Sequence, residues 1–189
     1  MMNTLEISRK ILRELESAVT SINPSQTEQL IDAILAAKNV YVAGAGRSLL
    51  MMRTFAMRLM HFGFKAYVVG DTVTPAITPE DLLIIGSGSG ETGTLKIIAS
   101  NARRIGAKIA LISLNPDSSL GHQAGVVVQI SASTPKLTQK ENETVFQPGA
   151  NVFEQSLLVV CDSMTIRIIE RLGIQHPNQE LMKRHANLE

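Results

Sequence analysis

The sequence predicts an α/β protein in which a parallel sheet lies between two layers of helices. Five short segments are apolar throughout instead of alternating, which is typical of strands buried on both faces of a parallel sheet. Segments with helical periodicity separate them, and glycine or a turn ends most of them. Strands that alternate with helices in this way indicate a doubly wound, three-layer αβα sandwich with five strands.

The predicted elements follow one another without a repeat or a linker. An amphipathic helix opens the chain, with Ile7, Ile11, Leu15 and Ala18 on one face. The strands are expected at 40–43, 66–69, 82–85, 107–113 and 126–130, and further helices at 25–37, 47–62, 92–104, 118–124 and from 149 to about 172. We expect one domain over 1–189, comprising N-terminal helices (4–37), an α/β core (39–131), a surface loop (132–147) and a C-terminal helix with a tail (149–189).

Composition excludes several classes of protein. Hydrophobic residues make up 44% and charged residues 19%, as in globular domains, and the formal net charge is +1. This balance gives no reason to expect a nucleic acid or an anionic membrane as partner, so an anionic substrate needs a local site. The N-terminus lacks the apolar stretch of a signal peptide, and no apolar run approaches a membrane span, so we expect a cytoplasmic protein.

The last long helix is apolar on nearly all sides, and its single cysteine, Cys161, is interpreted as a core residue. Such a helix must be covered all round. It is either an interface between subunits or a central helix of the core.

Ligands of open α/β sheets bind beyond the carboxyl ends of the strands, so we expect a functional site in the loops that follow the strands. The loop after the first strand contains Gly44, Gly46, Arg47 and Ser48, which offer backbone and side-chain donors to an anion. It also resembles the start of a dinucleotide-binding loop, although Leu49 replaces the third glycine. This loop is therefore compatible with a phosphate site and with an NAD site, the latter helped by Asp71 after the second strand.

The loop after the third strand is rich in hydroxyl groups. Ser87, Ser89 and Thr92 can hydrogen-bond phosphate oxygens together with amides at the start of the next helix. No lysine follows, which excludes a nucleoside-triphosphate P-loop. The alternative is that one of these hydroxyls merely caps the helix.

Glu154 lies near the start of the last long helix, beside Phe153 and Leu157. A carboxylate in apolar surroundings is a candidate general base. The alternative is an ordinary acidic residue that interacts favourably with the helix dipole. The four histidines are scattered, with His61 near a helix end and His185 in the tail, so no catalytic metal is expected.

Several stretches in fixed order carry a resemblance to a known family: 44–48, 55–61, 69–71, 74–75, 87–92, 147–148, 153–155 and the terminal His-Ala-Asn-Leu-Glu at 185–189. Over nearly the whole chain they resemble the 6-phospho-3-hexuloisomerases of the SIS (sugar isomerase) family. The hydroxyl-rich loop alone would indicate only a SIS domain, whereas the first loop and the terminal stretch are more specific.

The resemblance implies a five-stranded parallel sheet, a homotetramer with sites at subunit interfaces, and no metal or organic cofactor. It implies interconversion of D-arabino-hex-3-ulose 6-phosphate and fructose 6-phosphate, a step of the ribulose monophosphate route of formaldehyde fixation. Carried over residue by residue, Glu154 is the proposed base and His61 or His185 assists, from a segment that a neighbouring subunit can supply. The substrate-binding residues are then Gly46, Arg47, Ser48, Ser87, Ser89 and Thr92.

The chain departs from the family pattern at one point. The family usually has Gln-Pro-Met-Gly before the Phe-Glu pair, whereas Gly149 and Ala150 follow Pro148 here. This difference concerns substrate fit and rate more than reaction type. Two rival functions stay open: a SIS-fold sensor that binds a sugar phosphate without turnover, which would not need Glu154, and an NAD-binding protein.

Overall fold

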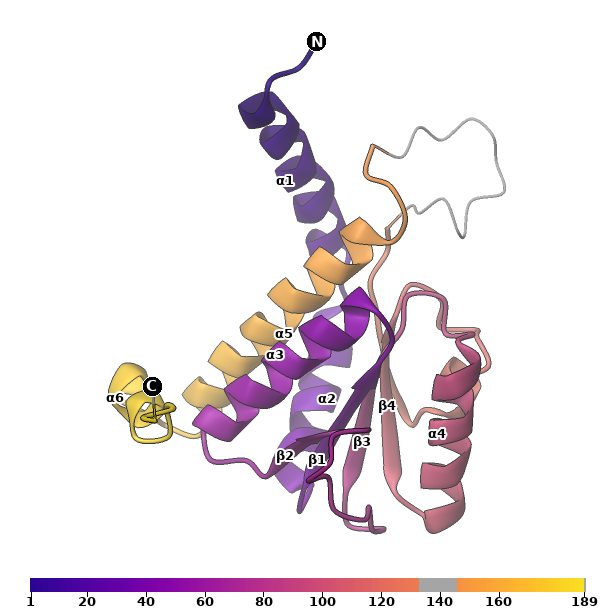
Figure 1. The fold of residues 1–189 in the computed structure, drawn as a ribbon, viewed down its shortest axis with the longest axis vertical. Helices are drawn as coiled ribbons and strands as arrows, with labels where there is room; N and C mark the ends of the chain where they lie inside the picture. Colours follow the sequence, from indigo (N-terminus) through magenta and orange to yellow (C-terminus); the bar gives the residue numbers. More distant parts are fainter. Residues whose placement is uncertain (133–145, 189) are drawn as a thin grey trace.

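A computed structural model describes residues 1–132 and 146–188, and it confirms the predicted fold class (Figure 1). The sheet has five strands in the order β2-β1-β3-β4-β5, and all four pairs are parallel. The strands are β1 (Val40–Gly44), β2 (Ala66–Val68), β3 (Leu82–Gly86), β4 (Lys108–Ser113) and β5 (Val126–Gln129). Because the chain changes direction across the sheet after β2, the loops after β1 and β3 become neighbours at one edge.

The helices are α1 (Thr4–Thr20), α2 (Pro24–Ala36), α3 (Arg47–His61), α4 (Gly93–Ile105), α5 (Asn151–Arg171) and α6 (Pro177–Met182). Local sequence explains several of their ends. Asn3 and Glu6 form a capping box at the start of α1, and Gly106 ends α4 in the left-handed conformation at φ 93°. The helix expected at 118–124 is wrong in extent, because only a 3₁₀ turn forms at Gly121–Gln123.

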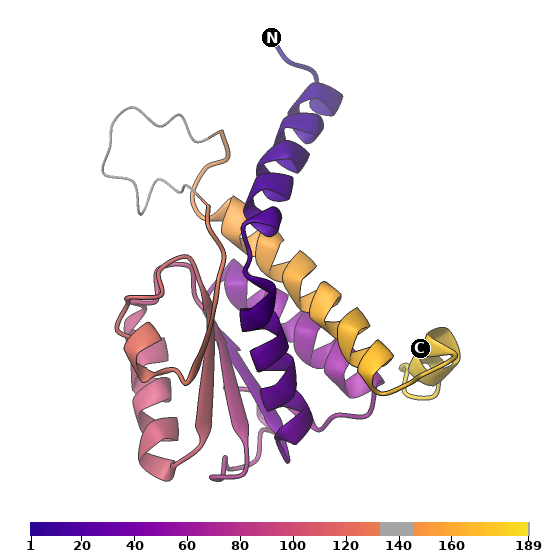
Figure 2. The same cartoon turned by 180° about the vertical axis from the view of Figure 1, so that it is seen from behind.

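Two hydrophobic cores lie on the two faces of the sheet. Successive strand residues point to opposite faces, so Val42 and Ile84 pack under α2, α3 and α5, whereas Tyr41 and Leu83 pack under α4. Figures 1 and 2 show α4 covering one face and α2, α3 and α5 covering the other. Helix α1 departs from this layering, since it packs on α5 and projects beyond the sheet, and the short α6 packs at the end of α3.

The projection of α1 explains why its predicted apolar face is only partly used. Ala18 is buried, Ile11 and Leu15 are half-buried, and Ile7 is exposed. On α5, Phe153, Leu157 and Cys161 are fully buried, and burial raises the pKa of the Cys161 thiol. The opposite side of α5 exposes Ile166, so residues 1–132 and 146–188 cover only one side of this apolar helix. Within the described residues, no helix is long and apolar enough to cross a membrane.

Candidate active site

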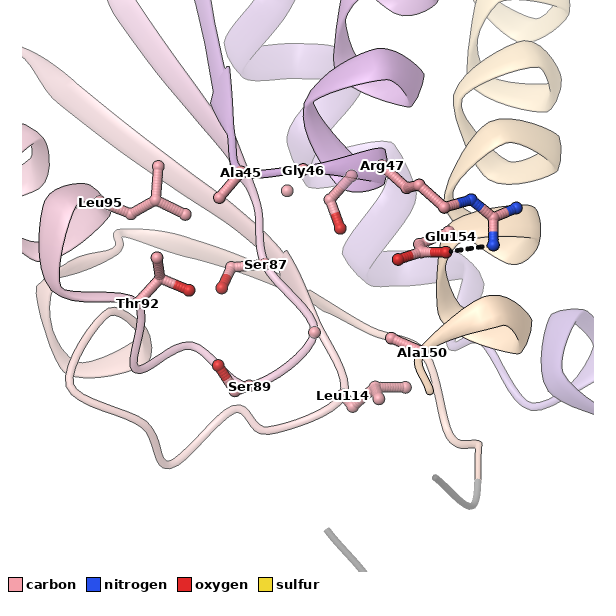
Figure 3. A pocket seen from close by; sticks show the side chains of 13 residues that line it. Ala45, Gly46, Arg47, Ser87, Ser89, Thr92, Leu95, Leu114, Ala150 and Glu154 are labelled. Atoms are coloured by element: carbon pink, nitrogen blue, oxygen red, sulfur yellow. Dashed lines mark ion pairs between the residues drawn. The ribbon is translucent and has the colours of Figure 1, made fainter. Parts of the chain in front are cut away.

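A cavity of about 300 Å³ lies at the carboxyl edge of the sheet, where the loops after β1 and β3 meet the start of α5. This is the position at which parallel sheets bind ligands. Its lining residues come from four separate parts of the chain: Ala45, Gly46, Arg47, Ser48, Gly86, Ser87, Gly88, Ser89, Thr92, Leu95, Leu114, Ala150 and Glu154 (Figure 3). The cavity therefore contains all six residues expected to bind substrate and the expected base.

The loop after β1 places backbone and side-chain donors at the cavity. Gly46 precedes α3 with φ at +56°, a conformation that residues with a Cβ rarely adopt. This turn sets Arg47 and Ser48 at the first positions of α3, where no side chain caps the helix. The first amides of a helix lack partners within the helix, and α3 begins with two residues that line the cavity.

The loop after β3 has its hydroxyl groups on the opposite side of the cavity (Figure 3). The Ser87 hydroxyl accepts a hydrogen bond from Gly90 N–H at 3.2 Å, and the Ser89 hydroxyl accepts one from Glu91 N–H at 3.2 Å. Thr92 is the N-cap residue of α4, but its side chain forms no capping hydrogen bond. The side chain of the N-cap residue therefore does not cap α4, while the Ser87 and Ser89 hydroxyls accept hydrogen bonds from amides of their own loop.

Glu154 lies in the first turn of α5, and its side chain is 12% exposed. The Arg47 guanidinium lies 2.9 Å from Oε2 and donates a hydrogen bond to Asn151. Oε2 accepts no hydrogen bond from the described residues, so the pair with Arg47 is electrostatic. In Figure 3 the second oxygen of the carboxylate points away from Arg47, toward the side of the cavity that carries Ser87 and Ser89.

Three helices begin at this cavity. Arg47 opens α3, Thr92 precedes α4, and Ala150 precedes α5. The N-terminal ends of helices carry partial positive charge, and their first amides lack partners within the helix. The site can therefore attract an anion although the chain as a whole is nearly neutral.

The structure brings the two candidate histidines together, but away from this cavity. The rings of His61 and His185 stack with centroids 5.7 Å apart and planes 10° apart. Burial, and then the charges of Arg58 and His185, lower the pKa of His61. His61 ends α3, whereas Arg47 begins it, so a helix of 15 residues separates the stack from Glu154 by about 20 Å at 1.5 Å per residue.

The tail that carries His185 is held to the end of α3. Arg184, just after α6, donates to the backbone carbonyl of His61 at 3.2 Å and pairs with Glu180 at 2.6 Å. This helix was not predicted from the sequence, because its six residues include no buried side chain. Arg184 therefore links the described part of the tail to the end of α3.

Comparison with known proteins identifies the family. Residues 33–160 match the SIS domain. A Bacillus subtilis protein named 3-hexulose-6-phosphate isomerase is 40% identical over 188 residues, covering 100% of both chains. The chain belongs to the 3-hexulose-6-phosphate isomerases of the SIS family.

Other similar proteins match this chain over most or all of their length. A Mycobacterium gastri protein with the same name is 40% identical over 93% of this chain and 86% of its own. A Methanococcus jannaschii protein, whose crystal structure was taken to infer a 3-hexulose-6-phosphate isomerase function, is 32% identical with a TM-score of 0.81 over 100% of both chains. The SIS match and this fold agreement cover every residue that lines the cavity.

The structure also bears on the NAD alternative and on a possible metal site. Asp71 pairs with Arg53 at 2.6 Å and does not line the cavity, which weakens the NAD alternative. Among the described residues, no group of three or more His, Cys, Asp and Glu side chains is arranged to hold a metal. No local pattern predicts the contact between Arg47 and Asn151, since 104 positions separate the two residues.

Proposed function

We propose that this protein interconverts D-arabino-hex-3-ulose 6-phosphate and fructose 6-phosphate, the reaction of the ribulose monophosphate route of formaldehyde fixation. The observation that carries the proposal is the placement of Glu154 in one cavity with the hydroxyl-rich loop, in a chain of this family. Phosphate binding alone would explain the loop. A nearly buried carboxylate facing the same cavity supports turnover as well.

The phosphate is held by the loop after β3. Ser87, Ser89 and Thr92 offer hydroxyl groups, and the first amides of α4 point to the same space. Ser48 and the backbone around Gly46 close the other side, and Arg47 supplies a positive charge. This assignment predicts that the protein binds the phosphate equally strongly in the ground state and in the transition state.

Glu154 is proposed to move the carbon-bound proton. It takes the proton from C2, and the C–H electrons form the C2–C3 double bond of an enediol as the C3 carbonyl oxygen gains a proton. The same carboxylic acid then returns the proton to C3 while O2 loses its proton and becomes the new carbonyl. Arg47, whose guanidinium lies 2.9 Å from the carboxylate, polarises the substrate oxygens during the reaction.

The proton transfer between O2 and O3 is assigned to His61 or His185 of a neighbouring subunit. Within one chain these rings lie about 20 Å from Arg47 along a straight helix, too far to touch a substrate bound at Glu154. A site at a subunit interface, in a homotetramer, resolves this separation. The lowered pKa of His61 favours the neutral ring, which can both donate and accept a proton near neutral pH.

The proposal includes no metal and no organic cofactor, because the carbonyl shift is a net movement of protons. It also includes a cytoplasmic location. A phosphate dianion does not readily cross a bilayer, since transfer of charge into hydrocarbon is costly, so the enzyme is expected where sugar phosphates are made.

The deciding experiment is Glu154→Gln in a coupled assay that follows fructose 6-phosphate formation from the 3-hexulose 6-phosphate. The amide keeps the size of the side chain but cannot accept the C2 proton. We expect kcat to fall by about 10²–10⁴-fold, the usual cost of removing a general base, while fructose 6-phosphate still binds. The wild type should exchange the C2 proton with solvent deuterium or carry it to C3, and the variant should do neither.

Two outcomes would change the assignment. Near-normal kcat in Glu154→Gln would transfer the role of base to another residue. A wild type that binds fructose 6-phosphate without exchange or isomerisation would establish the sensor alternative instead. Titration calorimetry with NAD in parallel tests the third alternative, for which no binding is expected.

A further inference from the structure

Glu91 is an acidic residue within the loop proposed to bind phosphate, between Ser89 and Thr92. A carboxylate so close to a phosphate dianion would repel it if the two faced each other. Ser89 and Thr92 line the cavity, whereas Glu91, which lies between them in the sequence, does not. The Glu91 carboxylate therefore interacts with residues outside the cavity.

The Glu91 carboxylate is bound to the segment after β4. Ser119 N–H donates to Oε1 at 2.6 Å, and the Ser119 hydroxyl donates to Oε2 at 2.7 Å. Lys96, one turn into α4, lies 3.1 Å from Oε2. These hydrogen bonds, led by the one from the backbone of Ser119, lower the pKa of Glu91 to about 2, so the carboxylate is ionised at every pH of interest.

Backbone hydrogen bonds and close packing hold the loop against residues 114–120. Leu120 N–H donates to the Gly90 carbonyl at 3.2 Å, and Leu114 N–H donates to the Gly88 carbonyl at 3.2 Å. Gly90 has φ at +66°, and a Cβ there would lie 1.9 Å from the Ser118 hydroxyl. The loop thus lies directly against residues 114–120, and Glu91 joins the two segments through its side chain.

We infer that Glu91 is a positioning residue for substrate phosphate, which holds Ser89 and Thr92 in place by binding Ser119 across the loop. This inference rests on the proposed function for the identity of the ligand. It assigns Glu91 no contact with substrate. Its effect should consequently appear in phosphate affinity and in the order of the loop, with the chemical step unaffected.

The test compares Glu91→Ala with Glu91→Gln. Alanine removes both bonds to Ser119, whereas glutamine keeps one acceptor for the Ser119 amide and one donor for its hydroxyl. We expect KM and the dissociation constant for fructose 6-phosphate to rise about tenfold in Glu91→Ala and much less in Glu91→Gln, with kcat unchanged in both. Amide hydrogen exchange of residues 87–92 should quicken in Glu91→Ala alone.

Two further variants sharpen the result. Ser119→Ala should weaken binding, and adding Glu91→Ala to it should cost less than Glu91→Ala costs alone, because the two side chains share one interaction. Glu80→Ala is the matched control: Glu80 is also an exposed carboxylate paired with a lysine, Lys38 at 2.7 Å, and it does not line the cavity. It should leave KM and loop exchange as in the wild type.

Different results would contradict the role of Glu91 and the proposed function. Wild-type affinity and exchange in Glu91→Ala would overturn the inference while leaving the isomerase proposal intact. Tighter binding in both neutral variants would overturn it too, by showing that charge repulsion outweighs positioning. A wild type that neither binds nor converts the sugar phosphate would refute the proposed function, and unchanged loop exchange in Glu91→Ala would then refute the positioning role independently.

Discussion

Short side chains make up most of the polar lining of the cavity. Ser48, Ser87, Ser89 and Thr92 contribute hydroxyl groups, and Arg47 and Glu154 contribute charge. Hydroxyl groups and helix amides bind an anion by hydrogen bonding at fixed positions, with little side-chain entropy to lose. Charge is then concentrated at the place where the proposed proton transfer occurs.

The first residue-scale prediction concerns these hydroxyls. Ser89→Ala and Thr92→Ala should raise KM more than they lower kcat, because a non-reacting phosphate is held equally in both states. Each lost hydrogen bond to a charged group should cost roughly 1.5–3 kcal/mol of binding. Ser100→Ala is the control, since its hydroxyl bonds Gln123 on the exposed side of α4. Fructose 6-phosphate affinity equal to wild type in both test variants would show that the phosphate site is misplaced.

Residues that act close together in sequence were easier to predict than those that meet across the fold. The loop at 87–92 shows three hydroxyls and two glycines within six positions, so its role can be read locally. The pair of Arg47 and Glu154 joins the starts of two helices that are far apart in the chain. Its existence depends on how α3 packs against α5, which no local pattern specifies.

At the scale of elements, strands were predicted within two residues of their ends. Each is an apolar run stopped by glycine or by a polar turn, and burial on both faces leaves one interpretation. The failures are the shortest helices. Six residues of α6 bury no side chain, and the turn at Gly121–Gln123 is too short for a periodic pattern. Contacts with α3 and with residues around Ser118 decide those two elements.

The tail after α6 supplies the element-scale prediction. His185→Ala should reduce kcat about a hundredfold if this ring assists the proton transfer, a typical contribution of a general acid. Arg184 should still hold α6 against the end of α3, so the melting temperature should stay within a few degrees of wild type. Truncation after Asn187 is the control, because it keeps His185. Full activity of His185→Ala would assign the step to His61 alone.

At the scale of the whole molecule, the outer side of α5 is the basis for the proposed assembly. Its inner side packs on α1, α2 and α3, while Leu158, Val159 and Ile166 stay half-buried or exposed. An apolar helix is expected to be covered on all sides, but the described residues of this chain cover α5 on its inner side only. A second subunit over the outer side would bury the rest.

A substitution that introduces one charge on the outer side of α5 tests the proposed assembly. Val159→Arg should convert the proposed tetramer into smaller species by light scattering, since an unpaired charge in an apolar interface is costly. Ile97→Arg adds the same charge to an exposed position of α4, on the other face of the sheet, and should leave the mass unchanged. Circular dichroism checks that both variants are folded. A wild type that is monomeric at assay concentrations would contradict the interface on α5.

The length of α3 also has a genetic consequence. In the proposed tetramer, Glu154 and His61 of one polypeptide serve different catalytic centres, because they lie near opposite ends of that helix. Two null alleles, one altered at Glu154 and the other at His61, would then yield mixed oligomers in which some centres receive an intact residue from each gene product. Such alleles would complement each other in a merodiploid cell, and neither would do so with a second copy of itself.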